Sequence, residues 1–167
     1  MYLTGSFGST VDFDTGTGTD NKTSNGSYDI FLTKINSDSS YGWTKTFGGI
    51  DNDYGHSVTS DPSGNVYLSG FFRDTADFNP GTEIDNKTSN GGSNIFSTRI
   101  NSDGSYGWTK TFGSTGTDVG HSIATDSSGN IYLTGYFNGT VDFDPGTGFD
   151  NKTSNGDWDI FLIKMTP

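Results

Sequence analysis

The chain has 167 residues, a formal net charge of −11, no cysteine, and apolar side chains at only 29% of its positions. The acidic balance disfavours nucleic acid, because duplex binding depends on Lys and Arg side chains that neutralise phosphates; it fits a cation site or a basic partner instead. Without cysteine no disulfide can staple the fold, and without an apolar run of about 18 residues no membrane-spanning helix is expected.

The first predicted strand begins at Tyr2-Leu3-Thr4-Gly5, and the same pattern returns at residues 67–70 and 132–135. The copies lie 65 residues apart, and no insertion or deletion interrupts the period. A fixed period of this kind indicates that one unit of a few strands is arrayed along the chain. We therefore treat residues 1–167 as one segment, with repeat units at 2–66, 67–131 and, incomplete, 132–167.

An acidic, glycine-containing segment follows this strand in every copy, for example Asp12-Phe13-Asp14-Thr15-Gly16. Its oxygen-bearing side chains alternate around a glycine, which suits Ca²⁺ with its about 6–8 oxygen ligands. The spacing differs from the EF-hand loop, and the alternative is turn chemistry, in which Asp and Asn side chains bond their own backbone. The candidate calcium ligands are Asp12, Asp14, Asp20, Asp77, Asn79, Asp85, Asp142, Asp144 and Asp150.

The same segment ends in Asp-Asn-Lys-Thr-Ser-Asn-Gly, which begins at Asp20, Asp85 and Asp150 without any change. We predict a loop here. Amides and hydroxyls beside Tyr28 and Trp158 suggest a sugar-binding groove, whereas the alternative explanation is recent duplication of a structural unit.

Four strand types make up the repeat. We number them by their expected order in a sheet: His56–Ser60 is strand one, Val66–Phe72 strand two, Ile30–Ile35 strand three and Tyr41–Phe47 strand four. Aromatic and β-branched residues bounded by Gly, Asn, Asp and Ser are typical of strands. The short polar segments between strands one and two, and between strands three and four, are typical of hairpin turns.

Strand three carries apolar residues on both faces, with Phe31 and Ile35 on one and Ile30 and Leu32 on the other. Such a strand is expected to be covered on both sides. A four-stranded antiparallel sheet that is covered on both faces and repeated in tandem is typical of a β-propeller blade, and a β-solenoid is the alternative. We therefore predict an all-β fold of propeller blades, with about 2.5 repeats in the chain.

Two histidines, His56 and His121, recur at the start of strand one. We predict that they are structural and hydrogen-bonded, with Asp51, Asp53 or Asp118 nearby. The chain contains no nucleophile elbow, P-loop, dinucleotide-binding fingerprint or zinc-ligand spacing. We therefore expect no catalytic residues and a protein that is not an enzyme.

The motifs at residues 106–113, 126–135, 141–146 and 159–164 resemble the bacterial β-propeller repeat called SBBP, and the resemblance covers essentially the whole chain. It implies a repeat module of a large secreted or cell-surface bacterial protein. We therefore expect a noncatalytic scaffold or binding surface with a glycan or protein ligand. A lectin-like carbohydrate binder is the alternative, and an enzyme acting on glycans or lactones is a third.

The order of the strands leaves the predicted propeller open. The chain supplies strands two to four, then all four strands, then strands one to three, whereas propellers close with about 4–8 blades. Exposed apolar sheet faces favour self-association. We expect either a homo-oligomer, in which two chains supply six blades, or a fragment of a larger propeller.

Overall fold

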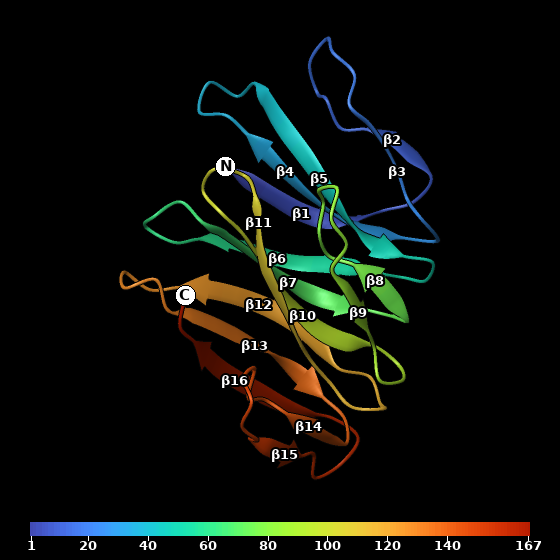
Figure 1. Cartoon of the computed structure of the whole chain (residues 1–167), viewed down its shortest axis with the longest axis vertical. Coiled ribbons are helices and arrows are strands. Elements are labelled where there is room, and N and C mark those ends of the chain that lie inside the picture. The colour runs from blue at the N-terminus through green and yellow to red at the C-terminus, as the bar shows by residue number, and fades with distance from the viewer.

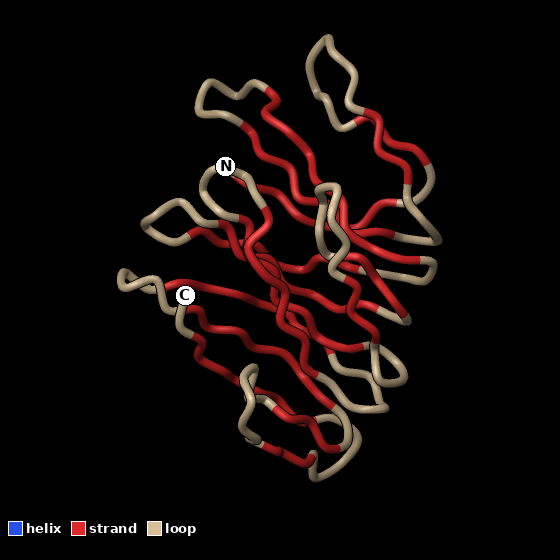
Figure 2. The backbone as a smooth tube through the Cα atoms, in the orientation of Figure 1, coloured by secondary structure: helices blue, strands red, loops and turns tan.

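The computed structural model describes all 167 residues and contains strands, turns and loops but no helix (Figure 2). None of its segments is therefore a helix with the length and apolarity that a membrane crossing requires. The strands are β1 (Tyr2–Phe7), β2 (Thr10–Asp12), β3 (Asn21–Thr23), β4 (Asp29–Ile35), β5 (Tyr41–Gly49), β6 (Tyr54–Ser60), β7 (Val66–Phe72), β8 (Thr75–Asp77), β9 (Asn86–Thr88), β10 (Asn94–Ile100), β11 (Tyr106–Phe112), β12 (Val119–Thr125), β13 (Ile131–Phe137), β14 (Thr140–Asp142), β15 (Asn151–Thr153) and β16 (Asp159–Met165).

The long strands form three antiparallel sheets, which we call blades 1, 2 and 3 in chain order. Blade 1 is β1-β4-β5, blade 2 is β6-β7-β10-β11, and blade 3 is β12-β13-β16. The blades follow one another along the long axis of the molecule (Figure 1). Blade 2 thus holds all four strand types in the predicted order, blade 1 lacks strand one, and blade 3 lacks strand four. The prediction of all-β propeller blades is confirmed.

Six short strands pair as three hairpins inside the acidic segments, and the prediction of loops there is wrong. We call β2–β3, β8–β9 and β14–β15 the acidic hairpins. Each strand has only three residues, too few to show a period in the sequence. In each pair, two threonine hydroxyls share a hydrogen bond; in β8–β9 the Oγ1 atoms of Thr75 and Thr88 lie 2.8 Å apart. Strand β8 also pairs with the end of β5, so this hairpin spans blades 1 and 2.

Apolar side chains fill the spaces between the blades. On β10 of blade 2, Phe96 and Ile100 lie in the cluster shared with blade 1, and Ile95 lies in the cluster shared with blade 3. All three are fully buried, so both faces of this strand are covered as expected. We call the face of a blade that is turned toward the preceding blade its leading face, and the opposite one its trailing face.

Two buried aspartates join neighbouring blades. Asp53 accepts hydrogen bonds from the backbone N–H of Gly49 (2.8 Å), at the end of blade 1, and of Arg73 (3.1 Å), after β7 of blade 2. Asp118 occupies the equivalent place in the next repeat and accepts from the N–H groups of Ser114 (2.6 Å) and Asn138 (2.8 Å). Burial raises the pKa of Asp53 to about 7.

This pKa predicts a pH dependence of stability. The folded chain holds a proton on Asp53 that the unfolded chain, with a pKa near 3.8, has already lost, so between these values the folded state binds more protons. We expect the free energy of unfolding to rise by about 3 kcal/mol as the pH falls from 7 toward 4 because of this group. Urea unfolding at several pH values measures it.

The Asp53→Asn variant separates the contribution of Asp53 from a general effect of acid pH. That general effect is the weaker repulsion among the other acidic groups, and it occurs in every variant. Asp53→Asn is expected to be less stable than wild type and to have a flatter pH dependence in this window. Asp38→Asn is the control. Hydrogen bonds from Ser40 lower the pKa of this exposed carboxyl, so Asp38 changes the pH dependence of the unfolding free energy only below about pH 4. Parallel curves for wild type and Asp53→Asn would contradict the prediction.

Candidate functional site

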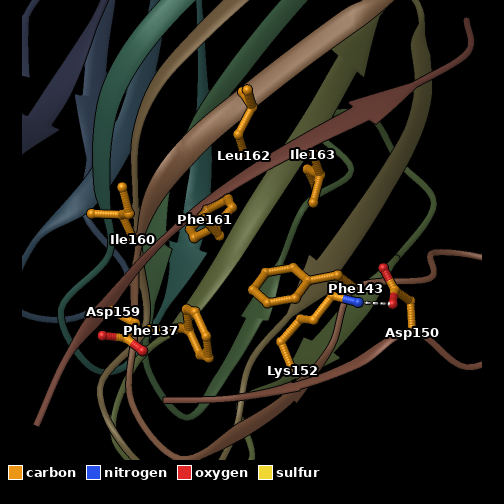
Figure 3. Close-up of a pocket in the computed structure, with 9 residues that line it drawn as sticks. All are labelled: Phe137, Phe143, Asp150, Lys152, Asp159, Ile160, Phe161, Leu162 and Ile163. Atoms are coloured by element: carbon orange, nitrogen blue, oxygen red, sulfur yellow. Dashed lines mark hydrogen bonds and ion pairs between the residues drawn. The ribbon is translucent and has the colours of Figure 1, made fainter. Parts of the chain in front are cut away.

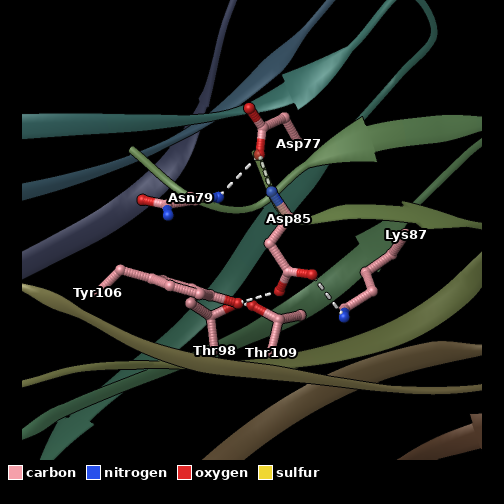
Figure 4. A network of polar contacts seen from close by, with 7 residues as sticks. All are labelled: Asp77, Asn79, Asp85, Lys87, Thr98, Tyr106 and Thr109. Carbon is pink, nitrogen blue, oxygen red and sulfur yellow. Dashed lines mark hydrogen bonds and ion pairs between the residues drawn. The ribbon is translucent and has the colours of Figure 1, made fainter. Parts of the chain in front are cut away.

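The acidic hairpin of blade 2 uses its predicted ligand atoms to organise its own turn (Figure 4). Asp77 Oδ1 accepts hydrogen bonds from the backbone N–H of Asn79 (3.0 Å) and of Asp85 (2.9 Å). Asn79 Oδ1 in turn accepts from the N–H of Gly81 (2.9 Å). These are the Asx-type bonds that the sequence left open as the alternative to metal binding.

Asp85 fastens this hairpin to the outer strand of its own blade. Its carboxylate accepts a hydrogen bond from the Tyr106 hydroxyl on β11 and forms an ion pair with Lys87 at 2.7 Å. Burial and the bond to Asp85 raise the pKa of Tyr106 well above its ordinary value. Figure 4 shows the hydroxyls of Thr98 and Thr109, 2.8 Å apart, beneath this contact.

The other two copies repeat the same bonds with one difference. Asp12 accepts hydrogen bonds from the backbone N–H groups of Asp14 and Asp20. Asp142 accepts them from the backbone N–H groups of Asp150 and Asp144, and these two bonds lower its pKa. Tyr41 donates to Asp20 as Tyr106 does to Asp85. Asp150 has no tyrosine partner, because blade 3 has no strand four. The nine predicted ligands therefore lie in three separate hairpins.

The calcium site stays a prediction. The structure contains no group of three or more His, Asp or Glu side chains that could together hold a metal ion. A calcium ion that bound only the folded chain would raise its melting temperature in proportion to the logarithm of its concentration. Melting curves with millimolar Ca²⁺ and with a chelator test this, and identical curves would remove calcium as a ligand.

A row of aromatic rings crosses all three blades and was not predicted. We call it the aromatic row. Neighbouring ring centroids lie 5.1–6.0 Å apart along the whole series. Its members, in spatial order, are Tyr28, Tyr54, Phe71, His56, His121, Tyr136 and Trp158.

The two histidines form the centre of the row, and their place follows from irregular pairing. The register between β6 and β7 shifts between Gly55 and Ser57, and the equivalent shift in blade 3 brackets His121, so each histidine lies at a bulge. A bulge re-aims its side chain out of the ladder. The two rings stack with centroids 5.4 Å apart and planes 10° apart.

His56 is hydrogen-bonded, as predicted, but its partner is not an acid. Its Nδ1 lies 2.9 Å from the carbonyl oxygen of Gly120 in blade 3, so Nδ1 carries the hydrogen and donates it. Asp53 and Asp118 instead bond the backbone that joins neighbouring blades. The histidine therefore helps to hold strands β6 and β12 of neighbouring blades together.

The aromatic row is open to solvent. Tyr28 and Trp158, at its ends, and both histidines are exposed, whereas Tyr54, Phe71 and Tyr136 are half-buried. Rings that are packed on one side and bare on the other provide a surface on which flat or apolar groups can stack. The signal in the sequence is the recurrence of His56 at His121, but the sequence does not show which rings of different strands meet.

Antiparallel blades in tandem, joined through apolar faces, place this chain among the β-propeller repeat proteins. Residues 42–70 and 107–141 match the family SBBP, described as a beta-propeller repeat. Two segments of the chain therefore match this repeat, as the motifs at residues 106–113 and 126–135 predicted. It is also 29% identical over 119 residues to an uncharacterized WD repeat-containing protein of Acanthamoeba polyphaga mimivirus, a match that covers 62% of this chain and 8% of that protein.

Proposed function

We propose that this chain is a noncatalytic β-propeller module that presents a binding surface, and that its ligand binds along the aromatic row. The observation that carries the proposal is the continuity of the row through all three blades, with ring centroids 5.1–6.0 Å apart. One extended ligand can contact every blade at once, and weak contacts that act together in this way give useful affinity.

The ligand class that suits the row best is a neutral carbohydrate chain, which makes the proposed module lectin-like. Sugar rings have an apolar face that stacks on aromatic side chains and polar edges that need hydrogen-bonding groups. Trp158 is 60% exposed and Tyr28 44% exposed, so both ends of the row are accessible. The net charge of −11 disfavours an anionic glycan.

Alanine at Tyr28 and alanine at Tyr54 test this proposal. Each is expected to weaken binding of a neutral oligosaccharide about tenfold, because the loss of an aromatic contact costs about 1.4 kcal/mol. A glycan array identifies the oligosaccharide, and calorimetric titration measures its affinity. Phe149→Ala, which removes a ring that is 84% exposed on the acidic hairpin of blade 3, is the control and should bind normally.

The lectin-like proposal fails if the array shows no neutral glycan, or if both variants bind as tightly as wild type. A protein ligand would remain as the other partner expected of such a module. Peptide ligands that compete for the same rings would be lost in the same variants, so the Tyr28 and Tyr54 substitutions test the location of the site separately from the class of its ligand.

We also propose that the chain assembles head to tail with a second copy, because the outward faces of its terminal blades are apolar. Ile160 is 87% and Leu162 72% exposed on the trailing face of blade 3, whereas Ile30 and Leu32 are fully buried where blade 2 covers the trailing face of blade 1. Leu3, on the leading face of blade 1, is 46% exposed. The exposed trailing face of blade 3 and the exposed leading face of blade 1 thus correspond to the two faces that pack against each other between neighbouring blades of the chain.

Light scattering tests this assembly. Wild type is expected at twice the 17.9 kDa mass of one chain, since two copies supply six blades, within the range of about 4–8 in which propellers close. Leu162→Asp and Leu3→Asp are each expected to be monomeric, and their mixture to form a one-to-one dimer through the intact faces. Ile84→Asp, at an equally exposed site on blade 2, should stay dimeric. Monomeric wild type contradicts the proposal.

A location outside the cell is a further proposal, and it rests on the family resemblance alone. Fractionation of cells that produce the protein tests it. Recovery in the medium or in the surface fraction supports the proposal, and recovery only from the cell interior contradicts it.

A further inference from the structure

A polar pocket of about 350 Å³ lies between blades 1 and 2. Blade 1 contributes Lys45 of β5, and blade 2 contributes the tip of its acidic hairpin (residues 79–83) and the turn between β10 and β11 (residues 104–106). Its lining differs from that of the pocket beside β16, which is mostly apolar and contains Phe137 and Phe143 (Figure 3). Small-molecule sites have volumes of about 300–1,000 Å³, so a small polar molecule fits the pocket between the blades.

Two opposite charges line this pocket, and neither is neutralised within the chain. Lys45 provides an ammonium group and Glu83 provides a carboxylate. The three ion pairs of the chain join other residues, so Lys45 and Glu83 pair neither with each other nor with any other side chain. A ligand that carries both an anionic and a cationic group can therefore neutralise the two charges at once.

The ammonium group of Lys45 is held in a fixed place beside an aromatic ring. Its nitrogen lies 5.1 Å from the centre of the Trp43 ring, and the residue is half-buried. Burial and the nearby charge of Lys22 lower the pKa of Lys45, and the charge of Asp103 offsets this only in part. A carboxylate bound in the pocket would stabilise the charged form of Lys45, which burial disfavours.

The carboxylate of Glu83 distinguishes this acidic hairpin from the other two. Glu83 is the only glutamate of the chain, and the equivalent residues are Gly18 and Gly148. An added Cβ atom at Gly18 would lie 2.2 Å from a carboxylate oxygen of Asp14, whereas in blade 2 the uncharged Asn79 takes the place of that acid. The hairpin of blade 2 thus has its acid at the tip, where it lines the pocket.

The two turns of blade 2 that line the pocket are held by hydrogen bonds of their own. Asn79 Oδ1 accepts from the backbone N–H of Gly81, which leaves the NH₂ group of Asn79 without a partner in the chain. Figure 4 shows this amide on the same side of the hairpin as the Tyr106 ring. In the other turn, Asp103 accepts from the N–H (2.9 Å) and the hydroxyl (2.6 Å) of Ser105. Walls that are ordered before binding reduce the free-energy cost of holding a ligand.

We propose that the pocket between blades 1 and 2 binds a small zwitterion, such as an amino acid or a short peptide. Lys45 binds the carboxylate of the ligand, Glu83 binds its ammonium group, and the amide of Asn79 donates a further hydrogen bond to the carboxylate. The net charge of −11 repels anions but not a molecule whose own net charge is zero. The pocket shares no residue with the aromatic row, so this site does not depend on the ligand proposed there.

NMR titration of the isotope-labelled chain with zwitterions of different lengths tests this site. Glycine, 4-aminobutanoate and 6-aminohexanoate carry the same two charges at increasing separation. At least one of them is expected to shift the backbone amide signals of Thr82 and Ser105 saturably, with a Kd in the millimolar range, because partly exposed ion pairs are weak. The carboxylate and the amine of the same length carry one charge each, so each should bind about threefold to fivefold more weakly than that zwitterion.

Two substitutions assign each charge of the ligand to its partner in the pocket. Glu83→Gly introduces the residue that the other two hairpins have, and this variant should bind the zwitterion no more tightly than the carboxylate analogue. Lys45→Met should bind the zwitterion no more tightly than the amine analogue. Lys110→Met is the control and should bind like wild type, because Lys110 lies over Trp108 in the same way, at 4.8 Å, but does not line the pocket.

Three results would overturn the proposal. The first is that no zwitterion of the series shifts the pocket signals saturably. The second is that wild type binds the singly charged analogues as tightly as the zwitterion, which would mean that the two charges do not act together. The third is that Lys110→Met loses as much affinity as Lys45→Met, which would place the ligand outside this pocket.

Discussion

Alanine in place of Phe78 is expected to destabilise the chain by about 3–5 kcal/mol, the usual cost of emptying a buried phenylalanine site. Phe78 is fully buried between blades 1 and 2. Its ring lies edge-on to Phe72 at 5.2 Å and tilted against Phe96 at 5.1 Å. Because whole domains are stable by only about 5–15 kcal/mol, this variant should be close to unfolded at room temperature.

The repeat supplies a matched control for this variant. Phe13 follows the same acidic residue in the first copy, but it is only half-buried, since no blade covers the leading face of blade 1. Phe13→Ala should therefore cost clearly less than Phe78→Ala. Urea unfolding followed by tryptophan fluorescence measures both, and equal losses would mean that Phe78 does not support the contact between the blades.

Alanine in place of Gly70 is expected to cost about 3 kcal/mol or more, at or beyond the upper end of the usual range for overpacking. A Cβ atom at Gly70 would lie 1.8 Å from the carbonyl oxygen of Tyr54 and 3.1 Å from the ring of Phe96. Gly70 pairs with Gly55 beside the bulge at His56. The backbones of strands one and two approach so closely here that no side chain fits between them.

Gly5→Ala is the control for this second substitution. Gly5 occupies the same position in blade 1, where no strand one is present, and its added Cβ would meet only the Phe31 ring, at 2.8 Å. A ring can move aside more easily than a paired backbone can, so the loss should be smaller. Chemical unfolding of the two variants makes the comparison, and a larger loss for Gly5→Ala would refute this explanation.

The sequence predicted the blades well because their strands are long and repeat with a fixed period. Strand two at Val66–Phe72 has the predicted bounds, and strand four begins at Tyr41 as predicted but extends two residues further, to Gly49. The two-sided apolar pattern of strand three matches the burial of Ile95 and Phe96. The acidic hairpins escaped prediction because strands of three residues show no period. Phe78 lies in a segment that was interpreted as a possible ligand loop because of its acidic neighbours, although its ring belongs to the core.

The aromatic row could not be predicted from the chain because it depends on contacts between blades. The period of two along a strand assigns side chains to faces, but His56 and His121 leave that pattern at bulges that the sequence does not mark. The same holds for Asp53. A buried acid that bonds two backbone N–H groups from different blades looks, in sequence, like any turn aspartate.

The aspartates that link the blades have a consequence for how the molecule melts. Each accepts from N–H groups on either side of a boundary between blades, so one blade cannot detach without leaving a buried carboxylate short of a donor. Arrays of repeats usually unfold gradually when the coupling between neighbours is weak. Here the coupling predicts one sharp calorimetric transition that is shared by all three blades, and two resolved transitions would show that the links are weaker than the sheets they join.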